Sequence, residues 1–216
     1  RQVGPLLYAA YIEGRIFGGS PPPERKLPEG VERGDNLHLH FLTLTGAINY
    51  HRDEQQLWGA ARDTFADADT HYVFMPHTVA QINFDKLKSD LQKHELSKKP
   101  EKDADIWHRI CTALVEDFEG DMAHLLSEAD YNISEALSTI RSSKYDFPYL
   151  GGNKLGSLWA HMLADSWRGH ELSGLDDIPI YTDRDVVRAT VAIGAVRGPW
   201  KGTYDELEGA VVEQGA

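Results

Sequence analysis

The chain has 216 residues, of which 41% are hydrophobic and 26% are charged, a composition typical of an ordinary globular protein. No apolar run approaches the roughly 18 residues of a membrane-spanning helix, and residues 1–5 lack the pattern of a signal peptide. The single cysteine, Cys111, excludes both an internal disulfide and a four-cysteine iron–sulfur cluster, and we expect it to be a buried thiol. These features predict a monomeric cytoplasmic protein with no membrane partner. We expect one domain over residues 1–216, or two small lobes that share a core.

The first part of the chain is predicted to be helical. Residues 5–17 form a short helix candidate. Residues 18–34 are rich in proline and glycine, and they form either an ordered wrap around the domain or a mobile arm. Dense apolar residues predict a buried helix over residues 35–50, although residues 36–41 also alternate as a strand would. The sequence of residues 53–56 is typical of a capping box and is expected to open the next helix.

The middle of the chain contains the clearest helical pattern. Residues 72–75 form a brief run that we expect to be extended, and residues 78–96 are expected to form one helix with a basic, solvated face. Residues 97–102 are a polar loop. Apolar residues then recur at helical spacing over residues 103–118, which predicts a long amphipathic helix. Another short helix is expected from about residue 122 to 126.

The stretch FPYLGGNK, residues 147–154, separates two further helical patterns. Tandem glycines before a helix let the backbone approach a ligand, and the N–H groups of a first helical turn bind anions, phosphate above all. The pattern predicts a hairpin at about residues 133–168, with Lys154 beside a phosphate site. The residues predicted to bind the phosphate are Gly151, Gly152 and Asn153. The alternative is a plain connector between two helices that carries a surface lysine.

A second stretch, residues 178–188, is a short apolar run followed by Asp183, which is suited to cap a helix. The Gly-x-Lys element together with this helix start resembles the helix-hairpin-helix DNA glycosylases of the base-excision family. The resemblance implies an all-α, helix-hairpin-helix glycosylase-like fold. In that family a hairpin lysine attacks the sugar carbon and a helix-capping aspartate assists. Lys154 takes the place of the lysine, and Asp183 takes that of the aspartate.

Within that family, the spacing is similar to that of the archaeal 8-oxoguanine DNA glycosylases. The separation between Lys154 and Asp183 is wider than in bacterial members, because residues 173–177 form an extra loop. Residues 49–58 also resemble the corresponding helix–turn–helix. The hairpin departs from the common pattern, which has glycine where this chain has Leu150. The resemblance implies a bifunctional DNA glycosylase with AP lyase activity. Such an enzyme excises an oxidised purine such as 8-oxoguanine from damaged double-stranded DNA through a lysine Schiff base.

The net charge of −12 argues against a nucleic-acid partner, since phosphate contacts need Lys and Arg. Residues 1–140 hold 14 basic and 23 acidic residues, a net of −9, and residues 203–216 hold four acids and no base. Residues 141–202, which carry both motifs, hold 8 basic and 7 acidic residues, a net of +1, so we expect weak DNA binding through few contacts. Two alternatives stay open. One, which the acidity favours because a small neutral substrate needs no basic surface, is an N-glycosidase that acts on a free modified nucleoside. The other is a non-catalytic helical DNA-binding module.

Ten histidines raise the question of a metal, but no pair has the i, i+4 spacing with a glutamate between that a helical zinc site uses. We therefore expect no metal and no other cofactor; the resemblance leaves room for a structural cation held by hairpin carbonyl groups. Of the five tryptophans, Trp58, Trp107 and Trp159 fall on helix faces that the core should bury. Trp200 follows a Gly-Pro pair in a loop and is the candidate for base stacking. Residues 203–206 predict a short final helix.

Overall fold

The structure, a computed structural model, describes residues 5–6, 9–10, 13, 21–181 and 184–194. These residues are mainly helical, and the β pairing among them is an isolated parallel bridge between Asn132 and Ser173. The all-α prediction is therefore confirmed for the described part. None of the described helices combines the length and the apolar content that crossing a bilayer requires. The chain divides into two compact units, one of Pro22–Pro179 and one of Arg1–Pro21 with Ile180–Ala216.

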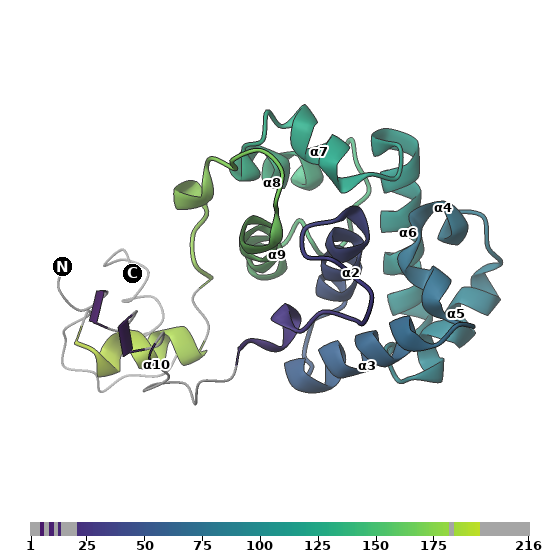
Figure 1. Cartoon of the computed structure of the whole chain (residues 1–216), viewed down its shortest axis with the longest axis horizontal. Coiled ribbons are helices and arrows are strands. Elements are labelled where there is room, and N and C mark those ends of the chain that lie inside the picture. Colours follow the sequence, from purple (N-terminus) through teal and green to yellow (C-terminus); the bar gives the residue numbers. More distant parts are fainter. Residues whose placement is uncertain (1–4, 7–8, 11–12, 14–20, 182–183, 195–216) are drawn as a thin grey trace. The chain divides into compact units, whose positions relative to one another are not determined.

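The larger unit is a set of helices joined by short connections (Figure 1). In chain order these are η2 (Pro23–Arg25), α2 (Asn36–Ala47), α3 (Glu54–Ala66), η3 (His71–Phe74), α4 (Pro76–Val79), α5 (Phe84–Lys93), α6 (Pro100–Phe118), α7 (Met122–Glu128), α8 (Ile133–Arg141), α9 (Asn153–Ser166) and η4 (Leu175–Asp177). Several begin where a polar side chain accepts from a first-turn N–H, and these caps are Asp35, Asp53, Asn83, Asp121 and Asn132. The helix start predicted at residues 53–56 is confirmed.

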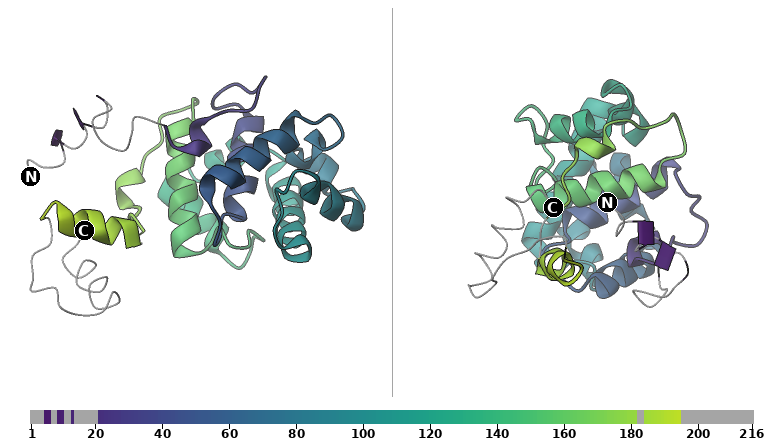
Figure 2. Two further views of the ribbon diagram at one scale, coloured as in Figure 1. Left: turned by 90° about the horizontal axis from the view of Figure 1, so that it is seen from below. Right: turned by 90° about the vertical axis from the view of Figure 1, so that its left-hand side faces the viewer.

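Helix α2 forms the centre of this unit. Every residue from His38 to Ala47 is buried. Helices α3, α6, α7 and α9 pack against α2, and Figures 1 and 2 show it enclosed by the other helices. The hydroxyl of Thr43 on α2 accepts a hydrogen bond of 3.0 Å from Nε1 of Trp159 on α9. This bond holds the two buried helices in register, and the buried helix predicted over residues 35–50 is confirmed.

Helix α6 matches the predicted amphipathic helix but begins earlier. It starts at Pro100 because proline suits the first helical position, where no intrahelical donor is needed. Asp103, where the pattern placed the start, is buried in the first turn and accepts from the backbone N–H groups of Lys98 and Lys99 at 2.9 Å each. Cys111 is fully buried, and burial raises the pKa of its thiol. The three tryptophans predicted to lie in the core are at most 1% exposed; they are Trp58, Trp107 and Trp159.

Two predictions for the middle of the chain are wrong. Residues 72–74 are not extended, because backbone bonds such as Val73 N–H to Thr70 O at 3.1 Å wind the chain into η3, and only Met75 after it is extended. Residues 78–96 do not form one helix, because α4 ends at Val79 and α5 spans Phe84–Lys93. The Asn83 side chain accepts from the N–H groups of Asp85 and Lys86, which starts α5 anew after a break. The periodic apolar residues on both sides of this break had favoured continuity.

The described part of the Pro/Gly-rich segment, residues 21–34, is an ordered wrap. The Arg62 guanidinium of α3 donates to the carbonyl oxygen of Pro23 at 3.1 Å. At the other end, Gly34 has φ +88° and lies so close to α9 that a Cβ would stand 2.8 Å from the carbonyl oxygen of Ser166. Between them, Arg25 binds Asp165 of α9 at 3.0 Å, and Arg33 binds the other oxygen of the same carboxylate. The segment therefore spans from α3 to α9.

The smaller unit contains α10 (Arg184–Ala192), and residues 5–6 and 9–10 are also helical. Helix α10 begins directly after Asp183, at the place that the apolar run and the aspartate predict. Asp183 itself lies outside the described residues, as do Trp200 and the final helix predicted at residues 203–206. Most of the helix predicted over residues 5–17 also lies outside them.

Candidate functional site

The predicted hairpin consists of α8, a connector over residues 142–152, and α9. The connector is anchored by the buried side chains of Phe147 and Leu150. The Nε of Arg141, the last residue of α8, donates to the carbonyl oxygen of Gly151 at 3.2 Å. The hairpin is therefore a packed element whose Gly-Gly turn is held against the end of α8.

The Gly-Gly turn presents the start of α9. Gly152 is the N-cap residue, and its own N–H donates to the carbonyl oxygen of Tyr149 at 3.1 Å. The helical ladder begins with the N–H of Gly156 bonded to the carbonyl oxygen of Gly152 at 2.8 Å. Helix geometry therefore gives the N–H of Asn153 no partner within α9. Of the three predicted phosphate ligands, Gly152 uses its donor to close the turn, and Gly152 and Asn153 are both exposed.

Lys154 lies in the exposed first turn of α9. Residues four, seven and eleven positions further along a helix share a face with the first, and here they are Leu158, His161 and Asp165. Lys154 therefore stands at the start of a helix face whose later turns carry an imidazole and a carboxylate. The sequence pattern indicated Lys154, but it did not indicate that this face lines a cavity.

A cavity of about 140 Å³ lies along this face of α9. A cavity of roughly 150 Å³ accommodates a benzene-sized ring. Its walls come from η2 and the residue before it, from α2 and from α9: Pro22, Glu24, Arg25, Leu42, Leu158, His161, Met162, Asp165 and Ser166. The cavity exists because the residue 21–34 segment lies over α9, which the pairing of Arg25 and Arg33 with Asp165 secures.

Two polar groups of this cavity are available to a ligand. Burial raises the pKa of the Glu24 carboxyl, and the carboxylates of Glu54 and Asp165 add to this effect. Nε2 of His161 is buried without a hydrogen-bond partner in the described part of the chain. Buried polar atoms in native proteins are almost always satisfied, so an orphaned nitrogen at a cavity wall is suited to a ligand group. The site combines apolar walls with a carboxyl whose pKa is raised and an imidazole nitrogen that has no hydrogen-bond partner among the described residues.

A second group of side chains lies beside the hairpin, and the sequence pattern did not reveal it. Tyr149, two residues before Gly151, stacks on Tyr50 with 5.1 Å between ring centroids and 24° between ring planes. Lys99 and Lys102, from the start of α6, place their ammonium groups over these rings. We call these four residues the tyrosine platform. The sequence pattern places both lysines in the polar loop of residues 97–102, and nothing in that loop predicts that they meet the two tyrosines.

The structure brings together only part of the predicted site. Lys154, Gly151, Gly152 and Asn153 lie in one turn, whereas Asp183 and Trp200 lie outside the described residues. Among the residues that are described, no cluster of three or more His, Cys, Asp or Glu side chains could hold a metal ion.

Comparison of the chain with protein-family models, with characterised proteins and with solved structures finds no match. The function is therefore inferred from the site.

Proposed function

We propose that the chain is a bifunctional DNA glycosylase with AP lyase activity, built on a helix-hairpin-helix glycosylase-like scaffold and acting as a cytoplasmic monomer. One observation carries the proposal: Lys154 and the cavity lined by Glu24 and His161 share one face of α9. At a rise of about 1.5 Å per residue, Lys154 lies roughly 10 Å along the helix axis from His161. A lysine side chain and one sugar ring bridge such a distance, with the base in the cavity.

The chemistry that this arrangement supports is nucleophilic. Nζ of Lys154 forms a bond to C1′ of the nucleotide while the bond from C1′ to the base breaks. The base leaves with the bonding electrons and takes up a proton. Opening of the sugar ring and loss of the remaining Nζ proton give a Schiff base, from which elimination cuts the strand on the 3′ side. The target base must first leave the duplex stack, which costs a few kcal/mol.

The cavity supplies recognition of the base. In its protonated form the Glu24 carboxyl would donate a hydrogen bond to a ring carbonyl, and His161 Nε2 would pair with a second polar atom of the ring. The apolar side chains of Leu42, Leu158 and Met162 cover the faces of the base. An oxidised purine such as 8-oxoguanine gains a carbonyl and an N–H on its ring edge, which such groups would recognise, and a cavity of about 140 Å³ would take one of its two rings.

The neutral state of the Lys154 amine depends on the bound substrate, and the role of Asp183 depends on the resemblance. Lys154 is exposed, so the desolvation that favours a neutral, nucleophilic amine must come from the DNA that covers it. Asp183, assigned by resemblance, would stabilise positive charge that grows on the sugar as the base departs.

Borohydride trapping tests the proposal. Borohydride reduces a lysine–DNA Schiff base to a stable amine, so wild type mixed with duplexes that contain single damaged bases should form a covalent adduct with at least one of them. Lys154→Gln should form none. Lys144→Gln, which removes the same charge from the exposed part of the hairpin connector, should form adducts as wild type does. Adducts that persist in Lys154→Gln would overturn the assignment of the nucleophile.

The net charge of −12 favours a second candidate, an N-glycosidase that acts on a free modified nucleoside, because a neutral substrate needs no basic surface. That activity would release free base from a nucleoside, with no DNA adduct and no duplex binding even at low salt. Duplex binding without either reaction would instead identify a non-catalytic helical DNA-binding module.

A further inference from the structure

The tyrosine platform is a cationic surface on an acidic protein. Lys102 Nζ lies 4.4 Å from the ring centroid of Tyr149 and 4.6 Å from that of Tyr50, and Lys99 Nζ lies 4.9 Å from that of Tyr50. In the described part of the chain, neither ammonium group has a carboxylate within ion-pair distance. Two lysines over stacked aromatic rings provide positive charge and a flat apolar surface at one place.

Acidic residues around these lysines are already engaged, among them Asp53 of the same surface, which accepts from the N–H of Gln56 at 2.9 Å. Glu95 pairs with Lys98 at 3.2 Å, and Glu101 pairs with Lys88 at 2.7 Å. Asp103 is buried and accepts from Tyr50 Oη, from Ser97 Oγ at 3.0 Å and from two backbone N–H groups. The positive charge of Lys99 and Lys102 is therefore the charge that this surface offers to a partner.

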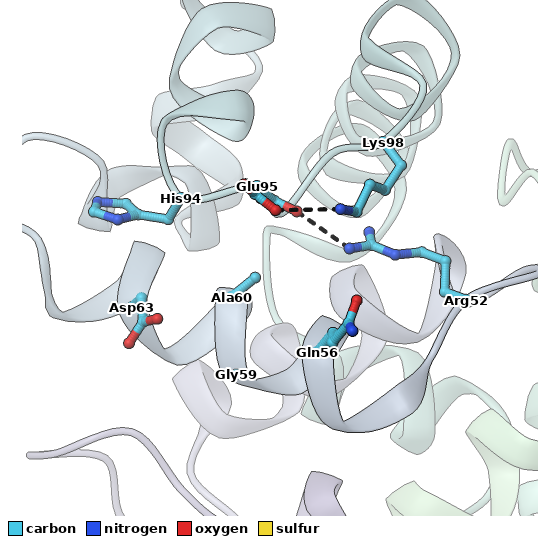
Figure 3. Close-up of a pocket in the computed structure, with 8 residues that line it drawn as sticks. All are labelled: Arg52, Gln56, Gly59, Ala60, Asp63, His94, Glu95 and Lys98. Atoms are coloured by element: carbon cyan, nitrogen blue, oxygen red, sulfur yellow. Dashed lines mark hydrogen bonds and ion pairs between the residues drawn. The ribbon is translucent and has the colours of Figure 1, made fainter.

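A neighbouring cavity of about 450 Å³ has cations in its wall, but these cations are already paired (Figure 3). Figure 3 shows Arg52 and Lys98 both directed toward Glu95. Arg52 donates to the carbonyl oxygens of Glu95, at 3.2 Å, and of Leu96, and the Lys98 ammonium is paired with the Glu95 carboxylate. These cations hold the loop between α5 and α6 in place.

A smaller cavity of about 310 Å³ lies at the platform itself. Its walls include the Tyr50 ring and Lys99, together with His51, Arg52, Asp53, Gln56, Lys98 and Asp103. Small-molecule sites start at about this volume. The cavity therefore has room for the sugar and phosphate of one nucleotide.

The backbone holds the two rings in position at some cost. Tyr149 has φ +68° and is 41% exposed, and His51, next to Tyr50, has φ +52°. Bulky residues rarely adopt the left-handed region, and such residues cluster at functional sites. The Tyr149 conformation is maintained by the bond from Gly152 N–H to the Tyr149 carbonyl oxygen, which is the same turn that starts α9.

We propose that the tyrosine platform binds a single strand of nucleic acid, with a phosphate between Lys99 and Lys102 and an unpaired base stacked on the tyrosine pair. Tyr149 belongs to the hairpin, so a strand that contacts the first turn of α9 continues onto the platform. The inference extends the proposed function by naming a second nucleic-acid contact, and it does not depend on Lys154 as the nucleophile. Base stacking on aromatic side chains explains how so acidic a chain holds a strand with few phosphate contacts.

Fluorescence anisotropy with two labelled oligonucleotides of equal length tests the platform. One is oligo-dT, and the other has abasic spacers, so that the phosphates are equal and the bases are missing. Wild type should bind oligo-dT about 5- to 100-fold more tightly than the spacer strand at low salt, the range expected for loss of a stacked base. Tyr149→Ala should lower the affinity for oligo-dT toward that for the spacer strand, whereas Tyr149→Phe should retain it.

Substitutions that remove the positive charge of Lys99 and Lys102 test the role of these two lysines. Lys99→Gln with Lys102→Gln should weaken binding of both strands and reduce the salt slope of log affinity by about 0.7, the value for one phosphate contact on a single strand. Lys86→Gln with Lys88→Gln is the matched control, because it also removes two positive charges. Lys86 Nζ also lies over a tyrosine ring, 5.2 Å from the ring centroid of Tyr72. Unlike Lys99 and Lys102, however, Lys86 and Lys88 are paired with carboxylates. This control should bind as wild type does.

Three outcomes would overturn the inference: equal affinity of wild type for the two strands, no binding of either at low salt, or equal effects of the two lysine pairs. Thermal melting of each variant shows whether the fold is intact, and Lys102→Gln alone provides a milder change. The two measurements are independent. Platform binding without borohydride adducts would reject the lysine chemistry alone, and adducts with a platform that does not bind would reject the platform alone.

Discussion

Gly156 of α9 lies against the carbonyl oxygen of Leu150, so closely that a Cβ at this position would stand 2.4 Å from that oxygen. The same Cβ would stand 2.9 Å from Cδ1 of Leu137 on α8. Real side chains do not make contacts this short with backbone atoms. The missing side chain at residue 156 therefore lets the hairpin connector close against both helices, and this closure positions the Gly-Gly turn before Lys154.

Gly156→Ala should destabilise the protein by about 1–3 kcal/mol, since an overpacked contact must displace the connector. Alanine otherwise favours a helix over glycine by about 1 kcal/mol, so the sign of the effect separates packing from propensity. Gly59→Ala on α3 is the control, because its Cβ would meet only the end of the Arg62 side chain, at 4.0 Å, and it should stabilise. Urea unfolding measures both. A midpoint for Gly156→Ala at or above that of wild type would contradict the prediction.

Glu24→Met should separate base recognition from strand cleavage. Methionine is similar to glutamate in size, but its side chain has no group that donates a hydrogen bond to a ring carbonyl. We expect base release from the preferred damaged duplex to fall at least about tenfold, in line with the loss of one buried hydrogen bond of roughly 1.5 kcal/mol. Cleavage of an abasic duplex, which has no base to place in the cavity, should be unchanged. Glu29→Met, at an exposed position of the same segment, should affect neither reaction. Equal losses on the damaged and abasic duplexes would remove Glu24 from base recognition.

Asp183→Asn should separate charge from capping. Asparagine is as good an N-cap as aspartate, so thermal stability should change by about 1 kcal/mol or less, with α10 starting at the next residue. If the carboxylate stabilises positive charge on the sugar, the single-turnover rate should fall by orders of magnitude while DNA binding is preserved. Parallel losses of stability and rate would show that Asp183 only caps the helix.

His38 and His40 should make the protein less stable in acid. Burial lowers the pKa of each to about 4 from the usual 6.5. Between these values the unfolded chain binds more protons than the folded one, so stability is complete above pH 6.5 and falls as the pH drops toward 4. One pKa unit corresponds to about 1.4 kcal/mol, so we expect a loss of roughly 1–3 kcal/mol for each histidine.

Urea unfolding at pH 7.5, 6.0 and 5.0 measures this loss. Nε2 of His40 is buried without a hydrogen-bond partner among the described residues, so His40→Leu removes a proton acceptor without breaking a bond at that nitrogen. The His40→Leu substitution should reduce the loss of unfolding free energy between pH 7.5 and pH 5.0 by about half. His170→Gln, at an exposed position, should leave the dependence as in wild type. An unchanged slope in His40→Leu would assign the acid sensitivity to other groups.

The helices and their caps could be predicted from the sequence because the forces that form them act over a few residues. The dense apolar run of α2, the cap at Asp53 and the periodic face of α6 are all patterns of residues that lie within a few helical turns of one another. The same local rules failed between α4 and α5, where apolar residues on both sides of Asn83 suggested one helix and a side-chain cap divided it. The position of Lys154 at the start of α9 could also be predicted from the sequence, since glycines before an amphipathic pattern mark a helix start.

The cavity and the tyrosine platform were decided by tertiary structure alone. Glu24 reaches the Lys154 face of α9 because Arg25 pairs with Asp165, a residue 140 positions away in the chain. Tyr50 meets Tyr149 because α2, the start of α6 and the hairpin connector converge, and none of these three segments carries a signal for the other two. Periodicity and capping report which side of a helix is buried, but which helices face each other depends on how all the buried faces pack together. A site assembled across helices is a product of that packing, so no single stretch of sequence contains it.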